Sequence, residues 1–518
     1  MIRRLAFASM LALCAAAPVA AETPRHGLST FGDLKYPPGF THFAYVNPAA
    51  PKGGEARTWA LETFDNLNPL ILKGIAAAGV ELGLTFETLM TPARDEPDAL
   101  YGLIAQTVEI GPGRAWAAFN LDPRGRWHDG SAITAEDVVF TFNAMITEGH
   151  PQFRILYRDV EGVEAASPGR VMFRFKPGDS RRDLPLLVAQ MTVMSKAWFK
   201  GRDFAATVLD PPLASGPYRI ERVDPGRAIV YRRVADHWGK DLPVYKGRHN
   251  FDRVRFDYYR DRDIALEAFF AGEYDWREEF TARNWSTLYE DRPPMKNNQV
   301  KREVLTDETP SGVQAFFLNT RRDKFKDRRV RMALNLAMDF EWMNRTLFYG
   351  LYSRTRSMFE NSELAATGLP GPAELALLNP YRAQLPPEVF TTEYQSPRSD
   401  AKAGQDGTRD NLRAAAQLLA EAGWTIKDKT LTNARTGEPF TMEFLNYEGT
   451  FQRVVNPYIR SLERLGIQVI VMRDVAWGYF YGLVNFDAEY GTRNLYGKDE
   501  LFAGRYNEAI HGAGLSYV

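Results

Sequence analysis

The chain has 518 residues, of which 45% are hydrophobic and 25% charged, and its formal net charge is -1. This length exceeds what one hydrophobic core usually supports, so we expect a globular protein of two or three domains. The near-zero net charge excludes the strong overall field by which proteins attract nucleic acid or an anionic membrane.

The N-terminus has the pattern of a secretory signal. Arg3 and Arg4 precede an apolar run, residues 5–17, that is too short to cross a bilayer, and residues 19–21 (Val-Ala-Ala) have the small side chains of a cleavage site. We therefore predict a cleavable signal peptide over residues 1–21. A twin-arginine signal and a lipid anchor both fit the flanking residues poorly.

The single cysteine of the chain, Cys14, lies inside this apolar run. Cleavage after Ala21 leaves a chain without any thiol, which cannot form a disulfide, a thiolate nucleophile or a cysteine-ligated metal site. No later run of about 18 apolar residues follows, so we expect no membrane insertion.

Strands and helices follow one another along the rest of the chain. Residues 22–55 are rich in proline, glycine and aromatic residues, and we expect them to wrap a surface rather than build a sheet. Alternating apolar residues predict strands at 55–61, 160–164, 171–175, 254–259, 314–319, 440–446 and 467–472. Helical periodicity predicts helices within 184–190, 265–276, 325–336 and 411–423.

Three of these stretches carry further detail. The helix within residues 265–276 is stopped by Gly272 and leads into the start of a strand. Residues 352–368 and 393–410 lack periodicity and are polar, so we predict a loop and a solvated linker. The strands at 440–446 and 467–472 flank another helix, which predicts a βαβ unit.

Residues 127–142, WHDGSAITAEDVVFTF, predict a turn followed by a helix. His128, Asp129 and Gly130 are turn residues. Thr134 is a suitable N-cap, and Asp137 three residues later resembles the partner residue of a capping box. A strand-turn-helix corner of this kind occurs in many α/β domains.

The sequence contains no arrangement of residues that indicates catalysis. We find no H-E-x-x-H, G-x-S-x-G or phosphate-loop motif, and we predict no cofactor and no metal. The adjacent carboxylates Glu278 and Glu279 indicate a solvated loop, although a two-carboxylate hydrolase depends on three-dimensional geometry. We interpret His128 and Asp129 as turn residues rather than an acid-base pair.

The segment W-H-D-G followed by T-A-E-D-V-V-F-T-F resembles the signature of the family 5 extracellular solute-binding proteins, the oligopeptide, dipeptide and nickel receptors of bacterial ABC importers. Further segments resemble the same family: ELGLTFETL at 81–89 (a helix in the family), SGPYRI at 215–220, HWG at 237–239, FFAGEYD at 269–275 and FKDRRVRMAL at 325–334. Residues 352–368 and 377–390 resemble its Yej-type peptide-binding branch. We interpret Asp327, Arg329 and Arg331 as salt-bridge residues.

The resemblance implies an α/β fold of the type II periplasmic-binding-protein kind, with two lobes and an extra subdomain inserted in the first lobe. It implies a first lobe from residues 22–74 and 201–305, an inserted subdomain over 75–200, and a second, ligand-closing lobe over 306–490. It also implies a periplasmic monomer that is not an enzyme and that delivers short peptides to the transmembrane subunits of an ABC permease.

The motifs that border the family's ligand cleft give the candidate binding residues: Phe64, Asp65, Asn66, Tyr218, Trp276, Asn319, Arg354, Phe359, Glu360, Asn361, Tyr447 and Trp477. Each has a structural alternative. Asp65 and Asn66 could instead bond the backbone of their own turn, Tyr218 and Trp276 could be core residues, and Glu360 and Asn361 could be solvated.

The resemblance ends near residue 487, and residues 491–518 are atypical, so we expect a truncated C-terminus or an internal deletion. Two alternatives stay open. The same fold could bind another solute, such as nickel, a metal chelate or an oligosaccharide, or the chain could be a secreted hydrolase.

Overall fold

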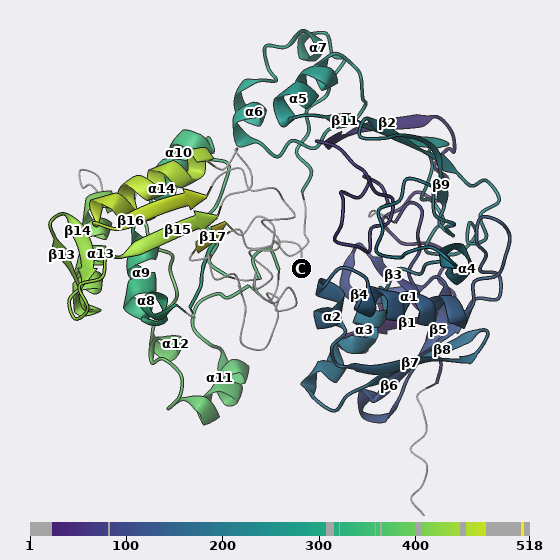
Figure 1. Cartoon of the computed structure of the whole chain (residues 1–518), viewed down its shortest axis with the longest axis horizontal. Coiled ribbons are helices and arrows are strands. Elements are labelled where there is room, and N and C mark those ends of the chain that lie inside the picture. Colours follow the sequence, from purple (N-terminus) through teal and green to yellow (C-terminus); the bar gives the residue numbers. More distant parts are fainter. Residues whose placement is uncertain are drawn as a thin grey trace, which may run out of the picture. The chain divides into compact units, whose positions relative to one another are not determined.

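The computed structural model describes residues 23–80, 83–306, 315–320, 322–357, 359–362, 365–399, 407–445, 452–472 and 509–511 (Figure 1). The chain divides into two compact units. Unit 1 comprises residues 1–55 and 64–256, and unit 2 comprises residues 56–63 and 257–518. Within the described residues, no helix combines the length and apolar character needed to cross a bilayer.

Unit 1 contains two antiparallel sheets, which combine hairpins with pairings between strands far apart in the chain. The smaller has the strand order β1 (Gly27–Ser29), β4 (Glu96–Gly102), β3 (Met90–Ala93). The larger has the order β5 (Ala105–Ile110), β6 (Trp116–Leu121), β8 (Arg170–Phe175), β7 (Val160–Ser167). The short 3-10 helices η1 (Pro112–Arg114) and η2 (Asp179–Arg182) lie near these strands in the chain.

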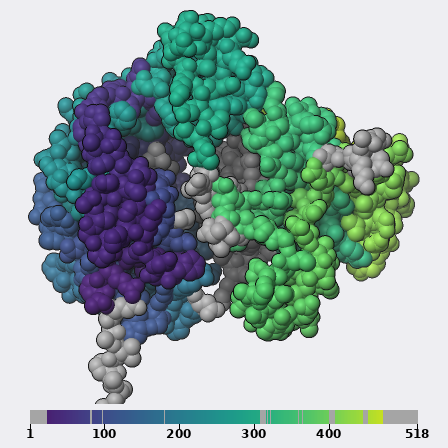
Figure 2. Space-filling model, turned by 180° about the vertical axis from the view of Figure 1, so that it is seen from behind, coloured from purple at the N-terminus to yellow at the C-terminus, as the bar shows by residue number. Residues whose placement is uncertain are grey.

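The N-terminal segment spreads over the surface of unit 1, as expected from its composition (Figure 2, purple). Tyr36 and Phe43 from this segment pack against Tyr101 of β4 with T-shaped ring contacts. Val244 and Tyr245 complete the same buried cluster. Aromatic packing rather than strand pairing therefore holds most of this segment in place.

The helix predicted after the W-H-D-G turn is α1 (Ala135–Thr147). The backbone N–H of Thr134 donates to the Asp137 carboxylate at 2.9 Å, which confirms the predicted capping box. Phe142 then packs on Phe173 of β8 with ring centroids 5.7 Å apart. Three further helices of unit 1 are α2 (Gln152–Leu156), α3 (Leu184–Ala189) and α4 (Lys196–Phe199).

A four-stranded sheet has the order β2 (Glu55–Leu61), β11 (Arg253–Tyr259), β10 (Ala228–Arg233), β9 (Tyr218–Asp224). The boundary between the two units falls inside β2 and inside β11. The N–H of Arg253 donates to the Gly54 carbonyl, and the N–H of Glu62 donates to the Tyr259 carbonyl. These bonds at the two ends show that β2 and β11 run parallel.

Unit 2 is built around the order β12 (Phe316–Leu318), β17 (Ala509–His511), β15 (Thr441–Leu445), β16 (Gln468–Met472). β15 and β16 are parallel and are joined through α14 (Gln452–Arg464), which confirms the predicted βαβ unit. A hairpin of β13 (Trp424–Lys427) and β14 (Thr430–Asn433) follows α13 (Gly407–Glu421). Gly423 ends that helix with a φ of 84°, as its position predicted.

The remaining helices of unit 2 are α5 (Arg262–Phe270), α6 (Ala282–Thr287), α7 (Pro293–Lys296), α8 (Asp323–Lys326), α9 (Arg328–Leu336), α10 (Phe340–Leu347), α11 (Pro372–Leu378), η3 (Asn379–Tyr381) and α12 (Glu388–Thr391). The other predicted strands and helices have counterparts here or in unit 1, except the strand start expected after Gly272, because residues 271–281 form turns, bends and irregular backbone. Asp327 caps α9 and forms an ion pair with Arg329 at 2.7 Å, as expected.

One predicted helix is wrong. Residues 83–89 form turns and irregular backbone instead of the helix expected over 81–89. The physical reason is that backbone groups of this segment form hydrogen bonds with distant residues of unit 1 instead of with each other. Leu84 and Thr85 accept backbone hydrogen bonds from Tyr218 and Gly216, and the Glu87 side chain is buried.

Candidate functional site

The loop after β2 carries three of the predicted binding residues in unit 1. Phe64 is buried, whereas Asp65 is exposed and its carboxylate accepts a hydrogen bond from the N–H of Ile75 at 2.6 Å. Asn66 is 1% exposed, and its side chain bonds to backbone groups inside the loop. Of the three side chains, Asp65 alone is exposed to solvent.

The Asn66 amide is satisfied on both of its atoms. Its Oδ1 accepts from the N–H groups of Asn68 at 3.0 Å and Val208 at 3.1 Å, and its Nδ2 donates to the Asn68 carbonyl at 2.7 Å. This arrangement favours the turn role over direct ligand contact. It joins the loop to a segment that is about 140 residues away in the sequence.

A buried carboxylate, Glu87, joins the family-like motifs of unit 1. Its two oxygens accept hydrogen bonds from the Tyr245 hydroxyl at 2.7 Å and the Trp238 indole at 3.0 Å. Nε2 of His237 lies 3.2 Å from the same carboxylate and 2.9 Å from the Ser215 carbonyl. Burial, followed by the Glu87 charge, raises the pKa of Tyr245 well above its ordinary value.

The W-H-D-G turn joins the same assembly. Nε2 of His128 lies 2.8 Å from the Gly216 carbonyl, and burial lowers the pKa of His128. Asp129 accepts hydrogen bonds from the N–H and hydroxyl of Ser131. His128 and Asp129 therefore both stabilise a turn, as predicted. Tyr218 is 2% exposed and donates to the Phe251 carbonyl at 2.8 Å, so it lies in the core of unit 1.

Unit 2 contains the polar loop at residues 352–362. Arg354 is half-buried; Nη2 donates to Asn335 Oδ1 at 2.7 Å, and Nη1 donates to the Pro397 carbonyl. Burial lowers the pKa of this guanidinium. Arg354 therefore ties the loop to α9 and to the predicted linker.

The next residues of the same loop are more accessible. Phe359 is 53% exposed, and Asn361 is exposed with a left-handed φ of 60°. Glu360 is half-buried and accepts a hydrogen bond from the N–H of Arg356 at 3.0 Å. The loop thus brings four predicted residues together, with Phe359 and Asn361 facing solvent.

The last predicted residues differ in their surroundings. Asn319 is 4% exposed directly after β12, whereas Trp276 is 60% exposed after α5. Trp276 is therefore a surface residue and not a core residue. Tyr447 and Trp477 lie outside the described residues.

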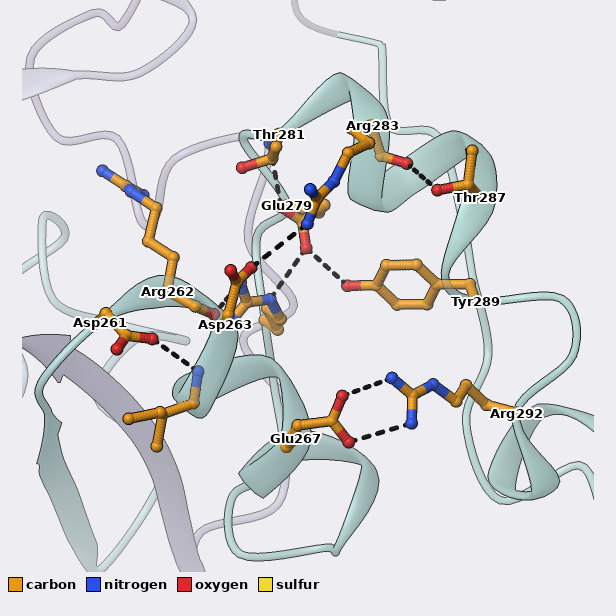
Figure 3. A network of polar contacts seen from close by, with 12 residues as sticks. Asp261, Arg262, Asp263, Glu267, Glu279, Thr281, Arg283, Thr287, Tyr289 and Arg292 are labelled. Atoms are coloured by element: carbon orange, nitrogen blue, oxygen red, sulfur yellow. Dashed lines mark hydrogen bonds and ion pairs between the residues drawn. The ribbon is translucent and has the colours of Figure 1, made fainter. Parts of the chain in front are cut away.

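Sequence reasoning missed a buried ion pair beside Trp276. The Arg277 and Glu279 side chains are 1% and 3% exposed, and Arg277 Nε lies 3.1 Å from Glu279 Oε2. The prediction of a solvated carboxylate is therefore wrong for Glu279, because Tyr289 and Thr281 also donate to it (Figure 3). The alternation W-R-E-E-F was the one signal that could have placed Arg277 and Glu279 on an inward face.

The predicted residues fall into two groups. Phe64, Asp65, Asn66 and Tyr218 belong to unit 1, and Trp276, Asn319 and the 354–361 loop belong to unit 2. In the part of the chain that the structure describes, no three His, Cys, Asp or Glu side chains are grouped so as to hold a metal ion. The ligand roles of all these residues stay predictions.

Comparison with known proteins identifies the family. Residues 99–493 match the family described as bacterial extracellular solute-binding proteins, family 5 Middle. The chain is 43% identical over 449 residues to the uncharacterized protein YejA of Escherichia coli K12, covering 86% of this chain and 73% of that one. It is 39% identical over 492 residues to the probable peptide-binding protein YejA of Agrobacterium fabrum, covering 93% and 79%.

The fold is also that of solved solute-binding proteins. The oligopeptide-binding protein AppA of Bacillus subtilis, solved with a nonapeptide, matches with a TM-score of 0.60 at 19% identity, over 84% of this chain and 77% of that one. These matches confirm the predicted resemblance, including its Yej-type branch, the two-lobed α/β fold, and the prediction of a binding protein rather than an enzyme. The chain belongs to the family 5 bacterial extracellular solute-binding proteins.

Proposed function

We propose that this chain is the periplasmic binding component of an ABC importer, which captures short peptides and delivers them to the transmembrane subunits of a permease. The observation that carries the proposal is the 39% identity over 492 residues to a probable peptide-binding protein. The signal-like residues 1–21 support export to the periplasm.

The physical basis of peptide capture is main-chain recognition. A short extended peptide exposes N–H and C=O groups that can pair with a receptor strand whatever the side chains are. Aromatic and hydrated pockets then tolerate varied side chains. Closure of two lobes on the guest excludes water and gives the permease one closed shape to recognise.

The proposed lobes keep the predicted boundaries. Residues 22–74 and 201–305 form the first lobe, residues 75–200 form the inserted subdomain, and residues 306–490 form the closing lobe. In this arrangement the exposed side chains Asp65, Trp276, Phe359 and Asn361 contact the guest directly. The buried Asn66 and Tyr218 act by holding those loops in place, as do Arg354 and Glu360.

In the proposed function, the protein works as a monomer without a cofactor and binds neither nucleic acid nor lipid. The net charge of -1 supports the absence of a nucleic-acid partner. Delivery then depends on protein contacts with the permease.

A thermal-shift screen of the mature chain against random tri- to deca-peptides tests the proposal. A ligand at 100 times its Kd stabilises the folded state by about 2.7 kcal/mol, so binding peptides raise the melting midpoint in a dose-dependent way. A chelated nickel series and a chromogenic substrate panel are run in parallel. A folded sample that responds to a chelate and to no peptide, or that turns over a substrate, overturns the peptide assignment.

A further inference from the structure

The predicted linker of unit 2 contains a short segment that is held against the rest of the unit. Ser396, Pro397 and Ser399 are half-buried, whereas the residues just before them, 391–395, are exposed. Ordering such a segment costs conformational entropy, so specific contacts must hold it in place. We call residues 396–399 the strap.

Ser399 anchors the strap to the N-terminal end of α10. Its hydroxyl lies within hydrogen-bonding distance of two carboxylates, Oδ1 of Asp339 and Oε2 of Glu341, the latter at 2.7 Å. The N–H of Ser399 donates to the same Glu341 oxygen at 2.9 Å. Hydrogen bonds to ionised groups are stronger than bonds between neutral groups, so a single serine can hold this end of the strap.

The anchor point is itself fixed by the helix. Asp339 is the N-cap of α10, and its Oδ1 accepts from the N–H of Trp342 at 3.0 Å. Glu341 lies in the first turn of the same helix, where the helix dipole favours a negative charge. Both carboxylates therefore have positions that do not depend on the strap.

The other end of the strap holds the base of the 352–362 loop. The Ser396 hydroxyl donates to the Thr355 carbonyl at 3.1 Å, and the Arg354 guanidinium donates to the Pro397 carbonyl. These two bonds join consecutive residues of the strap to consecutive residues of the loop. The predicted linker thus contacts the candidate binding loop directly.

Electrostatic attraction strengthens the contact at Arg354. Burial lowers the pKa of this guanidinium, and the nearby charges of Glu341 and Asp339 oppose that shift. The two carboxylates that hold Ser399 therefore also stabilise the Arg354 charge. Since Arg354 also donates to Asn335 Oδ1 at 2.7 Å, the loop base is held between α9, the start of α10 and the strap.

The tip of the loop is closed by bonds among its own residues and with Ala366. Ser357 Oγ accepts from the N–H groups of Phe359 at 3.1 Å and Ala366 at 3.0 Å, and the Glu360 carboxylate accepts from the N–H of Arg356 at 3.0 Å. Such bonds set the shape of the tip. Its position on unit 2 depends on the base that directly precedes it, which the strap holds.

We propose that the strap positions the 352–362 loop for ligand binding, with Ser399 as its anchor. Ser399 is then a positioning residue, which acts on the guest through the strap and the loop base without touching it. The inference rests on the proposed function, in which Phe359 and Asn361 contact the peptide. A loop already held in its bound arrangement loses less entropy on binding, so the strap raises peptide affinity.

Hydrogen exchange of the full mature chain without peptide tests the strap itself. Ser399→Ala removes the anchoring hydroxyl, whereas Ser399→Thr keeps it. In Ser399→Ala we expect the amides of Arg356 and Phe359 to exchange about tenfold faster than in wild type, and in Ser399→Thr close to the wild-type rate. The amides of α14 are the internal control. Unchanged exchange in the loop overturns the strap, and so does equal acceleration in α14, which would mean a general loss of stability.

Peptide affinity tests the positioning role. For the tightest peptide of the thermal-shift screen, we expect Ser399→Ala to raise Kd about fivefold and Ser399→Thr to restore it. The control is Thr287→Ala, which removes a hydroxyl that donates to the Arg283 carbonyl within α6 at 2.8 Å (Figure 3). This control should leave Kd unchanged. Wild-type affinity in Ser399→Ala overturns the positioning role.

A double variant shows whether Ser399 acts through the loop. Residues on one path of interaction are not additive, so Ser399→Ala should weaken binding much less in a Phe359→Ala background than in wild type. Equal effects in the two backgrounds overturn action through the loop. If no peptide binds while exchange in the loop is still accelerated, the strap stands as a structural element, and the proposed function and the positioning role are both overturned.

Discussion

Nε2 of His128 lies 2.8 Å from the carbonyl oxygen of Gly216, although the two residues are 88 positions apart in the chain. The contact joins the W-H-D-G turn to the S-G-P-Y turn. Gly216 also donates its N–H to the Thr85 carbonyl at 2.7 Å. Three family-like motifs of unit 1 therefore meet through backbone groups, which makes this junction a structural feature of the unit rather than a ligand site.

Substitution of Gly216 tests this junction. A Cβ at Gly216 would lie 2.5 Å from the Thr85 carbonyl oxygen, so Gly216→Ala forces the two backbones apart. We expect a loss of about 1–3 kcal/mol in the free energy of unfolding, measured by urea titration. Gly162→Ala is the control, because a Cβ there has no heavy atom within 4 Å. Similar midpoints for the two variants would contradict the close approach.

Local sequence patterns predicted much of the fold and little of the polar interior. The strand over residues 55–61, the capped start of α1 and the βαβ unit around α14 each depend on neighbouring residues, and all three are confirmed. Glu87 meets His237 and Tyr245, which lie 150 and 158 positions further along the chain. No spacing rule could have joined them, and the helix expected over 81–89 is absent from the described residues because these long-range bonds compete with helix formation.

In the candidate site, too, the sequence did not predict the polar contacts between residues that are far apart in the chain. Charge alone placed Glu279 in solvent, and only the three-dimensional packing of Arg277, Trp59 and Tyr289 around it shows otherwise. Asn66 was identified as important from its motif, but its two roles, loop support and ligand contact, could not be separated without the hydrogen bonds that saturate its amide.

The buried ion pair of unit 2 predicts a large stability difference between two similar variants. Glu279→Gln leaves the Arg277 charge buried without its counter-charge, and we expect a loss of about 3–5 kcal/mol. Arg283→Gln removes an exposed pair, in which Arg283 lies 3.7 Å from Asp263, and we expect a change within about 0.5 kcal/mol (Figure 3). Chemical denaturation followed by tryptophan fluorescence measures both. A Glu279→Gln protein as stable as Arg283→Gln would show that the pair contributes no net stability.

Acid should destabilise unit 1 through His249. Burial, followed by the charges of Arg248, His237 and Lys52, lowers the pKa of His249 from 6.5 to about 3. Because the unfolded chain binds the proton more readily, the contribution of His249 to stability is fully present above pH 6.5 and is lost as the pH falls toward 3. The slope for this one group is at most about 1.4 kcal/mol per pH unit.

The variant His249→Asn isolates that contribution. Asparagine tolerates the left-handed backbone at this position, where φ is 53°, and does not titrate in this range. We expect the difference in unfolding free energy between wild type and His249→Asn to change between pH 6.5 and 3 and to stay constant above pH 7. A difference that does not depend on pH would rule out proton linkage at His249.

Truncation of a buried predicted binding residue should lower stability, whereas truncation of an exposed one should lower peptide affinity. Asn66→Ala removes an amide that satisfies buried groups of Asn68 and Val208, and each group left unpaired is expected to cost about 1–3 kcal/mol of stability. Phe359 is 53% exposed, so Phe359→Ala should change stability by less than about 0.5 kcal/mol. If its ring covers the guest, peptide affinity falls by roughly 5- to 10-fold, equivalent to an aromatic contact of about 1 kcal/mol.

Tyr381 is the matched control for Phe359, because it is an exposed aromatic residue of unit 2, 58% accessible, that is not among the candidate binding residues. Tyr381→Ala should leave both stability and peptide affinity unchanged. Calorimetric titration with one peptide, beside thermal melts of all three variants, separates the two effects. Loss of affinity in Phe359→Ala and Tyr381→Ala alike would mean that exposed aromatic residues of unit 2 bind peptides without regard to the 354–361 loop, and retained affinity in Phe359→Ala would remove that loop from the binding site.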